Sequence, residues 1–241
     1  MARRTALLLL PLALAACAPQ PRTGAETVLL VPGGRIVGAW AELPEGAFPL
    51  PGPPLFADRA GGRLYLAYPY GLEVYQDGTL AASYPLPGVP TFLHARPGVV
   101  VGTTEGVFVP DRNLPPYPAR DARWREALWW TDGPAHRDDQ TLDPGPFRRV
   151  VADRKRVAFL GREAYFPGGA RFPLPPFRDA ELWGSLYLLT DEEVVRYAVS
   201  GAVLDRRRGR YRDLAVDATG VWLLDPQGRP VHLDPDLREA P

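Results

Sequence analysis

The stretch that decides the fold runs Leu64-Tyr65-Leu66-Ala67-Tyr68, a turn, Gly71-Leu72-Glu73-Val74-Tyr75, then Asp77-Gly78, then Thr79 to Leu86. Its short apolar and aromatic runs are typical of β-strands bounded by turns. Asp-Gly between two such runs favours a two-residue hairpin turn, because both central residues of that turn adopt positive φ. The stretch therefore predicts antiparallel strands joined by tight turns.

The same pattern of apolar run, turn and apolar run recurs along the chain. Its copies begin at intervals of 35, 28, 30, 29 and 35 residues, at Leu64, Val99, Ala127, Val157, Leu186 and Val221, with the copy at Ala127 the weakest. A period of about 20–50 residues indicates a repeat architecture, because one small antiparallel sheet cannot bury its own faces. Short strands with several turns per copy are typical of β-propeller blades.

Two further runs, Val28-Leu29-Leu30-Val31 and Arg35-Ile36-Val37, precede the first copy, and the last copy ends within 20 residues of its start. We interpret residues 27–38 as the strand or strands that complete the last blade. The predicted fold class is all-β, a β-propeller for which six blades are favoured and seven lean blades are the other count. A β-sandwich or an irregular barrel with coincidental spacing is the alternative. Residues 27–241 are predicted to form this single domain.

Two copies carry a more specific motif. Residues 98–109 read GVVVGTTEGVFV, and residues 217–225 read DATGVWLLD, with Asp-x-x-Gly-x-Trp in the second. Both resemble the blade repeat of two-component-regulator sensor propellers. The resemblance implies the propeller fold and carries no catalytic residue across.

The first seventeen residues have the layout of a secretory signal. Arg3 and Arg4 precede an apolar run of about ten residues, which ends in Ala15-Ala16 directly before Cys17. The run is shorter than the roughly 20 residues that a membrane-spanning helix needs. Leu14-Ala15-Ala16-Cys17 resembles the lipobox of bacterial lipoproteins. That resemblance implies cleavage between Ala16 and Cys17 and a diacylglycerol on the Cys17 sulfur, with a third acyl chain on the new amino terminus in most diderm bacteria.

Cys17 is the only cysteine of the chain. A secreted protein with one thiol forms no internal disulfide, which favours lipidation over an ordinary secreted protein with a coincidental cysteine. Residues 1–16 are predicted to be the signal peptide and residues 17–26 a lipidated, flexible tether. An aspartate after the lipidated cysteine retains lipoproteins in the inner membrane, but Ala18 stands there. We therefore expect the periplasmic face of the outer membrane in a diderm cell, and the cell surface otherwise.

The charge balance argues against a nucleic-acid partner. Removal of the signal leaves 26 basic and 28 acidic residues, so no strong field attracts nucleic acid or anionic lipid. The 29 prolines and 24 glycines are spread between the apolar runs and indicate many turns.

No cluster of metal ligands is visible in the sequence. His94, His136 and His232 lie in different copies and lack the spacing of a metal site. The dense polar group His136-Arg137-Asp138-Asp139 is interpreted as a solvated loop. No metal and no other cofactor is predicted.

No catalytic residue is predicted either. Ser83, Ser185 and Ser200 lack the context of an activated nucleophile, and no phosphate-binding glycine loop occurs. Carboxylates in a β-rich chain mostly lie in turns, so none is assigned a catalytic role. Trp129, Trp130, Trp183 and Trp222 fall in or beside apolar runs and are interpreted as packing between blades.

One basic run is a possible interaction patch, formed by Arg206, Arg207, Arg208, Arg210 and Arg212. It suits lipid phosphates or an acidic partner. Its other interpretation is an exposed turn between the fifth and sixth copies, with flanking aspartates that weaken its field.

The leading hypothesis is a non-catalytic, membrane-anchored propeller that binds another protein of the cell envelope. The alternative is a lipoprotein that binds a small ligand or sugar in the central channel. A hydrolase or lyase is the third hypothesis. Carboxylates and a histidine that converge within about 4 Å on one face would favour it.

Overall fold

The Leu64 stretch lies within a four-stranded antiparallel sheet in a computed structural model of the protein, which describes residues 27–240. Asp77 and Gly78 join β7 (Gly71–Gln76) to β8 (Thr79–Pro85) with φ angles of 50° and 74°. Both angles are positive, as this two-residue hairpin turn requires. The predicted hairpin is confirmed.

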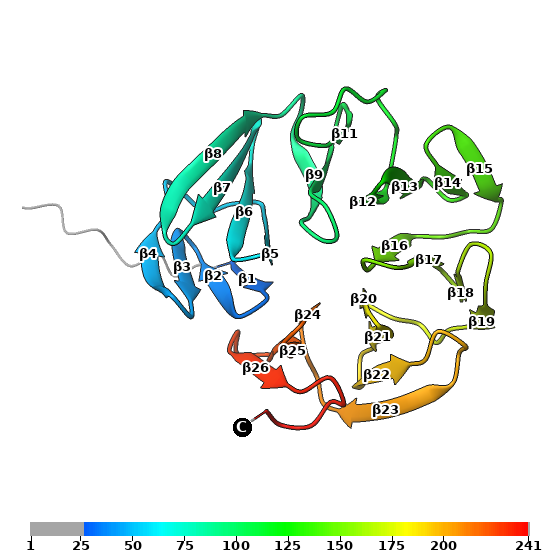
Figure 1. Cartoon of the computed structure of the whole chain (residues 1–241). Coiled ribbons are helices and arrows are strands. Elements are labelled where there is room, and N and C mark those ends of the chain that lie inside the picture. The colour runs from blue at the N-terminus through cyan, green and yellow to red at the C-terminus, as the bar shows by residue number, and fades with distance from the viewer. Residues whose placement is uncertain (1–26, 241) are drawn as a thin grey trace, which may run out of the picture.

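Seven antiparallel sheets, numbered here as blades in chain order, surround a central axis (Figure 1). Blade 1 contains β1 (Val28–Val31), β2 (Gly34–Val37), β3 (Trp40–Leu43) and β4 (Gly46–Pro49). Blade 2 contains β5 (Phe56–Ala60), β6 (Arg63–Tyr68), β7 and β8. Blade 3 contains β9 (Pro90–His94), β10 (Val100–Thr103) and β11 (Gly106–Phe108).

The other four blades continue around the ring. Blade 4 contains β12 (Asp121–Arg125), β13 (Ala127–Thr131), β14 (Ala135–Arg137) and β15 (Gln140–Asp143), and blade 5 contains β16 (Arg149–Ala152), β17 (Val157–Leu160), β18 (Glu163–Tyr165) and β19 (Arg171–Pro173). Blade 6 contains β20 (Asp179–Trp183), β21 (Ser185–Leu189), β22 (Glu193–Tyr197) and β23 (Val203–Arg208), and blade 7 contains β24 (Asp213–Asp217), β25 (Gly220–Leu224) and β26 (Pro230–Leu233). Across residues 27–240 there is no helix with the length and apolarity to span a bilayer.

The fold is an all-β propeller, and the preference for six blades is corrected to seven. Residues 27–38 do not complete the last blade, because β1 and β2 pair with β3 and β4 in a blade of their own. β3 and β4 have four residues each and are mostly exposed, and Glu42, Gly46 and Pro49 interrupt their apolar residues, so the search for apolar runs does not reveal them. The copies found in the sequence fall on or beside the second strand of blades 2–7.

The ring closes between blades 7 and 1 by packing of side chains. Within the described residues the two sheets share no strand, and β1 lies against β24 and β25. Leu30 packs there with Ala215 and Leu224. The Arg35 Nη1 group also donates a hydrogen bond of 2.6 Å to the carbonyl oxygen of Gly228.

The core of the protein is divided among the junctions of the ring. Each pair of neighbouring blades encloses a cluster of buried apolar side chains. Between blades 1 and 2, for example, Val31 and Ile36 pack with Leu64 and Leu66, each at most 2% exposed. Burial of one such side chain contributes roughly 1.5–3 kcal/mol. The four tryptophans predicted to pack between blades belong to such clusters, namely Trp129, Trp130, Trp183 and Trp222.

Two glycines with similar positive φ differ in how closely other atoms approach them, so the two can be compared to measure the effect of close packing alone. Gly220 begins β25 with a φ of 144°, and a Cβ there would lie 2.1 Å from the carbonyl oxygen of Leu233. Gly133 has a similar φ of 140° and open space around it. We expect Gly220→Ala to lower the free energy of unfolding by roughly 1–3 kcal/mol more than Gly133→Ala, as measured by urea denaturation. An equal loss of unfolding free energy in the two variants would contradict the close approach of β25 and β26.

Candidate functional site

The first strands of the blades surround the central channel. Each of β1, β5, β9, β12, β16, β20 and β24 lies against the first strand of the next blade around the ring. Side chains on these inner strands therefore meet residues from blades that are far apart in sequence. Charged residues concentrate at this position.

Four successive inner strands begin with a charged residue: Asp121, Arg149, Asp179 and Asp213. They belong to blades 4, 5, 6 and 7, so the ring brings them together at one end of the channel. Asp58 in the middle of β5, His94 at the end of β9 and Arg96 after it line the same cavity.

Asp121 links three neighbouring blades. Its Oδ1 atom lies 2.7 Å from Nε2 of His94 in blade 3, and its Oδ2 atom accepts a 2.7 Å hydrogen bond from the backbone N–H of Val150 in blade 5. Burial raises the pKa of the Asp121 carboxyl to about 6, although Arg149 and the backbone donors oppose the shift. Asp121 is therefore a structural connection whose charge changes in mildly acidic solution.

Two other carboxylates connect neighbouring blades in the same way. Asp58 of blade 2 accepts a 2.7 Å hydrogen bond from the backbone N–H of Ala95, next to Arg96, whose guanidinium lies 3.5 Å from the same carboxylate. Asp153 of blade 5 accepts a 3.0 Å hydrogen bond from the backbone N–H of Gly184 in blade 6. Carboxylates in or directly after the inner strands thus link neighbouring blades.

An ion pair crosses the channel. Arg123 on β12 is 2% exposed, and its Nη2 group lies 3.1 Å from Oε1 of Glu181 on β20, two blades away. Burial lowers the pKa of the Arg123 guanidinium, although Glu181 opposes the shift. Nε of Arg123 is buried and has no hydrogen-bond partner among the described residues, and the same holds for Nε of Arg96 and Arg149. The channel therefore contains guanidinium donors that the described chain does not use.

Asp179 and Asp213 form a carboxyl pair beside Arg149. Asp179 forms an ion pair with the Arg149 guanidinium and also meets the Asp213 carboxyl. Burial, with the neighbouring Asp179 charge, raises the pKa of Asp213 to about 8. At neutral pH the Asp213 carboxyl is therefore largely protonated and can donate a hydrogen bond to Asp179.

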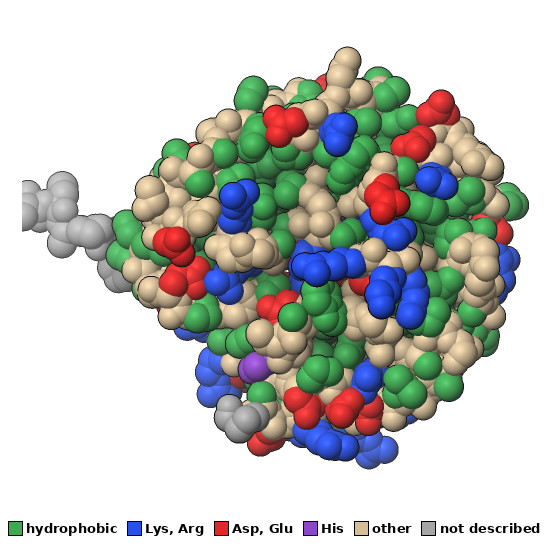
Figure 2. Space-filling model, in the orientation of Figure 1, with side chains coloured by type: hydrophobic (Ala, Val, Ile, Leu, Met, Phe, Trp, Pro, Cys, Tyr) green, Lys and Arg blue, Asp and Glu red, His purple; other side chains and the backbone are tan. Residues whose placement is uncertain are grey.

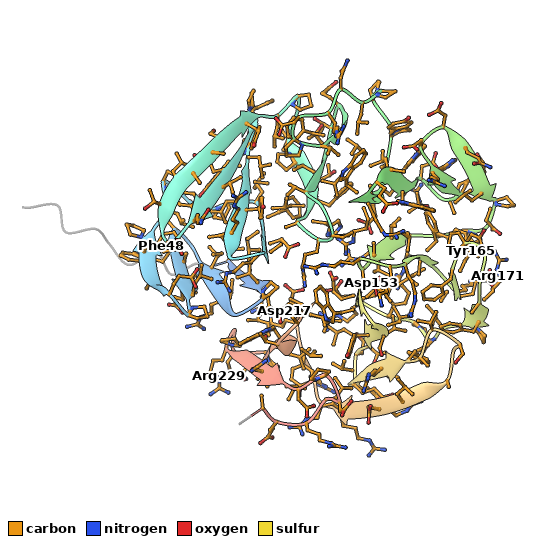
Figure 3. All side chains as sticks on the ribbon, viewed as in Figure 1. Phe48, Asp153, Tyr165, Arg171, Asp217 and Arg229 are labelled. Carbon is orange, nitrogen blue, oxygen red and sulfur yellow. The ribbon has the colours of Figure 1, made fainter. Side chains whose placement is uncertain are left out.

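Two cavities occupy the two ends of the channel. The start cavity, where the inner strands begin, has a volume of about 290 Å³ and is lined by residues that include His94, Asp121, Arg149, Asp179 and Asp213. The end cavity, where these strands end, has a volume of about 470 Å³. Its charged lining residues are Arg59, Arg96, Asp153, Arg154 and Asp217. Figure 3 labels Asp153 and Asp217 beside the centre of the ring, and Figure 2 shows basic side chains gathered near the centre of the same face.

The residues predicted to be lipidated and cleaved, Cys17 and Ala16, lie outside the described residues. The predicted arginine patch lies on blade 6 and the connection after it. Arg206, Arg207 and Arg208 belong to the outer strand β23, while Arg210 and Arg212 follow it, so the interpretation of the whole run as a turn is wrong.

Part of that arginine patch is already neutralised. Arg206 pairs with Glu193, and Arg207 lies 2.7 Å from Glu239. An outer strand of alternating exposed residues explains the run, because every second side chain faces water. The role of the patch in binding stays a prediction.

The histidines lie apart, as their spacing in the sequence predicts. His136 stacks on Trp130 and His232 on Trp222, with ring centroids 4.0 and 3.9 Å apart. His136 belongs to β14 and is 9% exposed, so its interpretation as part of a solvated loop is wrong. Among residues 27–240 no three His, Asp, Glu or Cys side chains form a group suited to a metal ion.

Sequence reasoning missed the charged channel. Its signal is a short internal repeat before the inner strands of blades 4, 6 and 7: Arg120-Asp121-Ala122, Arg178-Asp179-Ala180 and Arg212-Asp213-Leu214. The repeated Arg-Asp step precedes an apolar residue at the same place in each blade, which a search for apolar runs alone does not detect.

Comparisons with known proteins support the fold. No protein-family model matches the chain, and no curated protein does. The chain is similar to BBS1N, solved in complex with ARL6DN, with a TM-score of 0.62 and 15% identity over 82% of this chain and 87% of that one. It is also similar to Hsv2 of Kluyveromyces lactis, with a TM-score of 0.51 and 10% identity over 86% and 92% of the two chains. These identities are low, so the likeness shows the fold alone.

BamB of Moraxella catarrhalis is a third similar structure, with 11% identity over 85% of this chain and 80% of that one. Its TM-score is 0.49, which carries no argument about function. None of these comparisons supports the resemblance to two-component-regulator sensors, which stays a prediction from two copies of the repeat.

The raised pKa of Asp213 predicts a pH-dependent stability. The unfolded chain loses this proton near the ordinary value of 3.8, and the folded chain keeps it until about pH 8. Between these values the folded chain binds more protons, so the free energy of unfolding falls as pH rises, by up to about 1.4 kcal/mol per pH unit for one group. Asp213→Asn should flatten this dependence in urea denaturation, because the amide stays neutral.

The matched control for this prediction is Asp191→Asn, since the Asp191 side chain is 86% exposed. This control should leave the pH dependence of the wild-type protein unchanged. A wild-type stability that rises between pH 5 and pH 8 would contradict the protonated state assigned to Asp213.

Proposed function

We propose that this chain is a lipid-anchored, non-catalytic propeller that binds another protein of the cell envelope. The observation that carries the protein-binding part is the ring of seven blades, because such a ring presents two broad faces of loops on a rigid frame. BBS1N, with the same fold, was solved in complex with ARL6DN. That complex supports the general point that a propeller can bind a protein.

The membrane-anchored part rests on the sequence. Leu14-Ala15-Ala16-Cys17 follows a basic start and an apolar run, as in bacterial lipoproteins. Each buried methylene contributes about 0.8 kcal/mol, so two or three acyl chains anchor a protein stably. Ala18 after the cysteine favours the outer membrane in a diderm cell.

The test has two readouts on the full-length chain in its own cells. Cys17→Ala should abolish incorporation of labelled palmitate and move the protein from the membrane pellet to the soluble fraction, because no acyl chain remains. Ala18→Asp should keep the label and shift the protein to the inner membrane of a diderm cell. Unchanged labelling or unchanged pelleting of Cys17→Ala would contradict the anchor.

The binding part of the proposal is tested separately. The acylated protein purified from native membranes should bring down one envelope protein in stoichiometric amount, and this association should survive in the detergent-free soluble form of Cys17→Ala. Purification without any stoichiometric partner would count against a scaffold.

The start cavity supports a second candidate function. His94 and Asp121 lie 2.7 Å apart in a cavity that the carboxyl pair of Asp179 and Asp213 also lines, and this convergence is the one that favours a hydrolase or lyase. The same cavity suits a small ligand. A screen of small sugars and organic acids by thermal shift tests it. A ligand at 100 times its Kd adds about 2.7 kcal/mol of stability, and the shift should disappear in His94→Ala.

A further inference from the structure

The end cavity continues outward between two blades. A second hollow of about 630 Å³ lies between blades 2 and 3. Tyr65 and Val99 line both the end cavity and this second hollow. The two hollows therefore adjoin, and together they are called the radial groove, with the first at the centre of the ring and the second between blades 2 and 3.

Two features of the backbone open the outer part of this groove. Blade 3 has three strands, because the chain leaves the sheet after Phe108 and residues 109–112 line the groove instead of pairing as a fourth strand. On the opposite wall, the pairing of β7 and β8 shifts register between Val74 and Tyr75, which leaves Ala81 as an extra residue of β8. Such a bulge bends the strand locally.

Three arginines line the inner part of the groove, and one of them is exposed and unpaired. Arg59 and Arg96 each pair with one carboxylate, Glu45 at 2.9 Å and Asp58 at 3.5 Å, yet the Nε of each is buried and has no partner within residues 27–240. Arg154 is exposed and forms no ion pair within the described chain.

Two of the three aspartates in the groove are engaged by local donors. Asp153 accepts hydrogen bonds from the backbone N–H groups of Lys155, Arg156 and Gly184. Asp217 accepts hydrogen bonds from the backbone and the hydroxyl of Thr219. Their charges remain, but their oxygens are less available to the arginines of the groove.

The outer part combines apolar and basic groups. Val74, Ala82 and Tyr84 line it, and Arg63 and Arg112 stand beside them. Neither arginine forms an ion pair in the described chain, and Arg112 lies over the Trp124 ring at 5.7 Å. Five arginines and three aspartates line the whole groove. Glu45 and Asp58 pair with two of the arginines, so Arg63, Arg112 and Arg154 are the cations left for a partner of negative charge.

We propose that this radial groove binds an extended acidic segment of a partner protein. A carboxylate of the segment lies at the inner arginines, and its apolar side chains lie between blades 2 and 3. The inference rests on the proposed protein-binding function and assigns its face and the chemistry of its partner. The exposed large apolar side chains of the described chain all lie outside the groove lining, which favours a peptide over a lipid surface.

Photo-crosslinking of the full-length, acylated chain in native membranes tests the proposal. The crosslinking residue replaces Ala81 in the groove and, as a control, Ala202, which is exposed in blade 6. A product should form at position 81 and not at position 202. The partner peptide at the crosslink, identified by mass spectrometry, should contain Asp or Glu residues beside apolar ones.

Charge reversal supplies the second measurement. Arg154→Glu should reduce the yield of the product at position 81 about tenfold, which corresponds to ~1.4 kcal/mol of binding free energy. Arg238→Glu, also exposed but after the last strand of blade 7, should leave the yield unchanged. Ala81→Trp, which fills the outer groove, should prevent stoichiometric copurification of the partner, whereas Ala202→Trp should not.

Each contrary outcome has a distinct meaning. A partner that crosslinks at position 202 but not at 81 would overturn the groove and leave the protein-binding function intact. A phospholipid adduct at 81, a crosslinked segment without carboxylates, or a yield insensitive to Arg154→Glu would overturn the acidic peptide. No protein product at either position, together with no copurifying partner, would overturn both proposals.

Discussion

Every blade must bury its two faces against its neighbours, and this constraint governs the rest of the structure. A sheet of three or four short strands has no interior of its own, so the apolar residues collect in clusters at the junctions of the ring. Seven such sheets satisfy the constraint only when the last meets the first. The inner strands are then brought around one axis, where residues distant in sequence become neighbours. The position of the charged channel follows directly from the apolar packing.

Side chains in the channel connect different blades by hydrogen bonds and an ion pair. Asp58, Asp121 and Asp153 each accept a hydrogen bond from the backbone of a later blade, and Arg123 reaches Glu181 across the axis. A buried ion pair rarely adds much net stability, because the cost of desolvation offsets the attraction. The directional hydrogen bonds instead restrict which blades can stand beside one another. The hydrogen bonds of the channel thus help to fix the order of the blades, while the Nε atoms of Arg96, Arg123 and Arg149 stay buried without a partner among the described residues.

The fold class was predictable because apolar runs and Asp77-Gly78 report local strand and turn geometry. The number of blades was not, since β3 and β4 are only four residues long and Glu42, Gly46 and Pro49 interrupt the apolar runs on which the count depends. The charged channel could not be predicted either. A pair such as Arg123 with Glu181 forms because the ring closes, and no spacing in the sequence indicates it. The predicted lipid site at Cys17 is the reverse case. A linear motif is sufficient to predict it, and the described part of the chain contributes nothing to it.

The junction of blades 7 and 1 differs from an ordinary join between blades because covalent continuity is missing there. Each other pair of blades is linked by the chain, whereas this pair is held by Leu30, Ala215, Leu224 and the Arg35 hydrogen bond to Gly228. The first described strand, β1, forms one side of the junction, so tension applied through the N-terminal end of the chain enters the ring at this place. The ring therefore has one junction without a covalent link. A pulling force applied through the N-terminal end of the chain reaches this junction before it reaches the junctions that the chain spans.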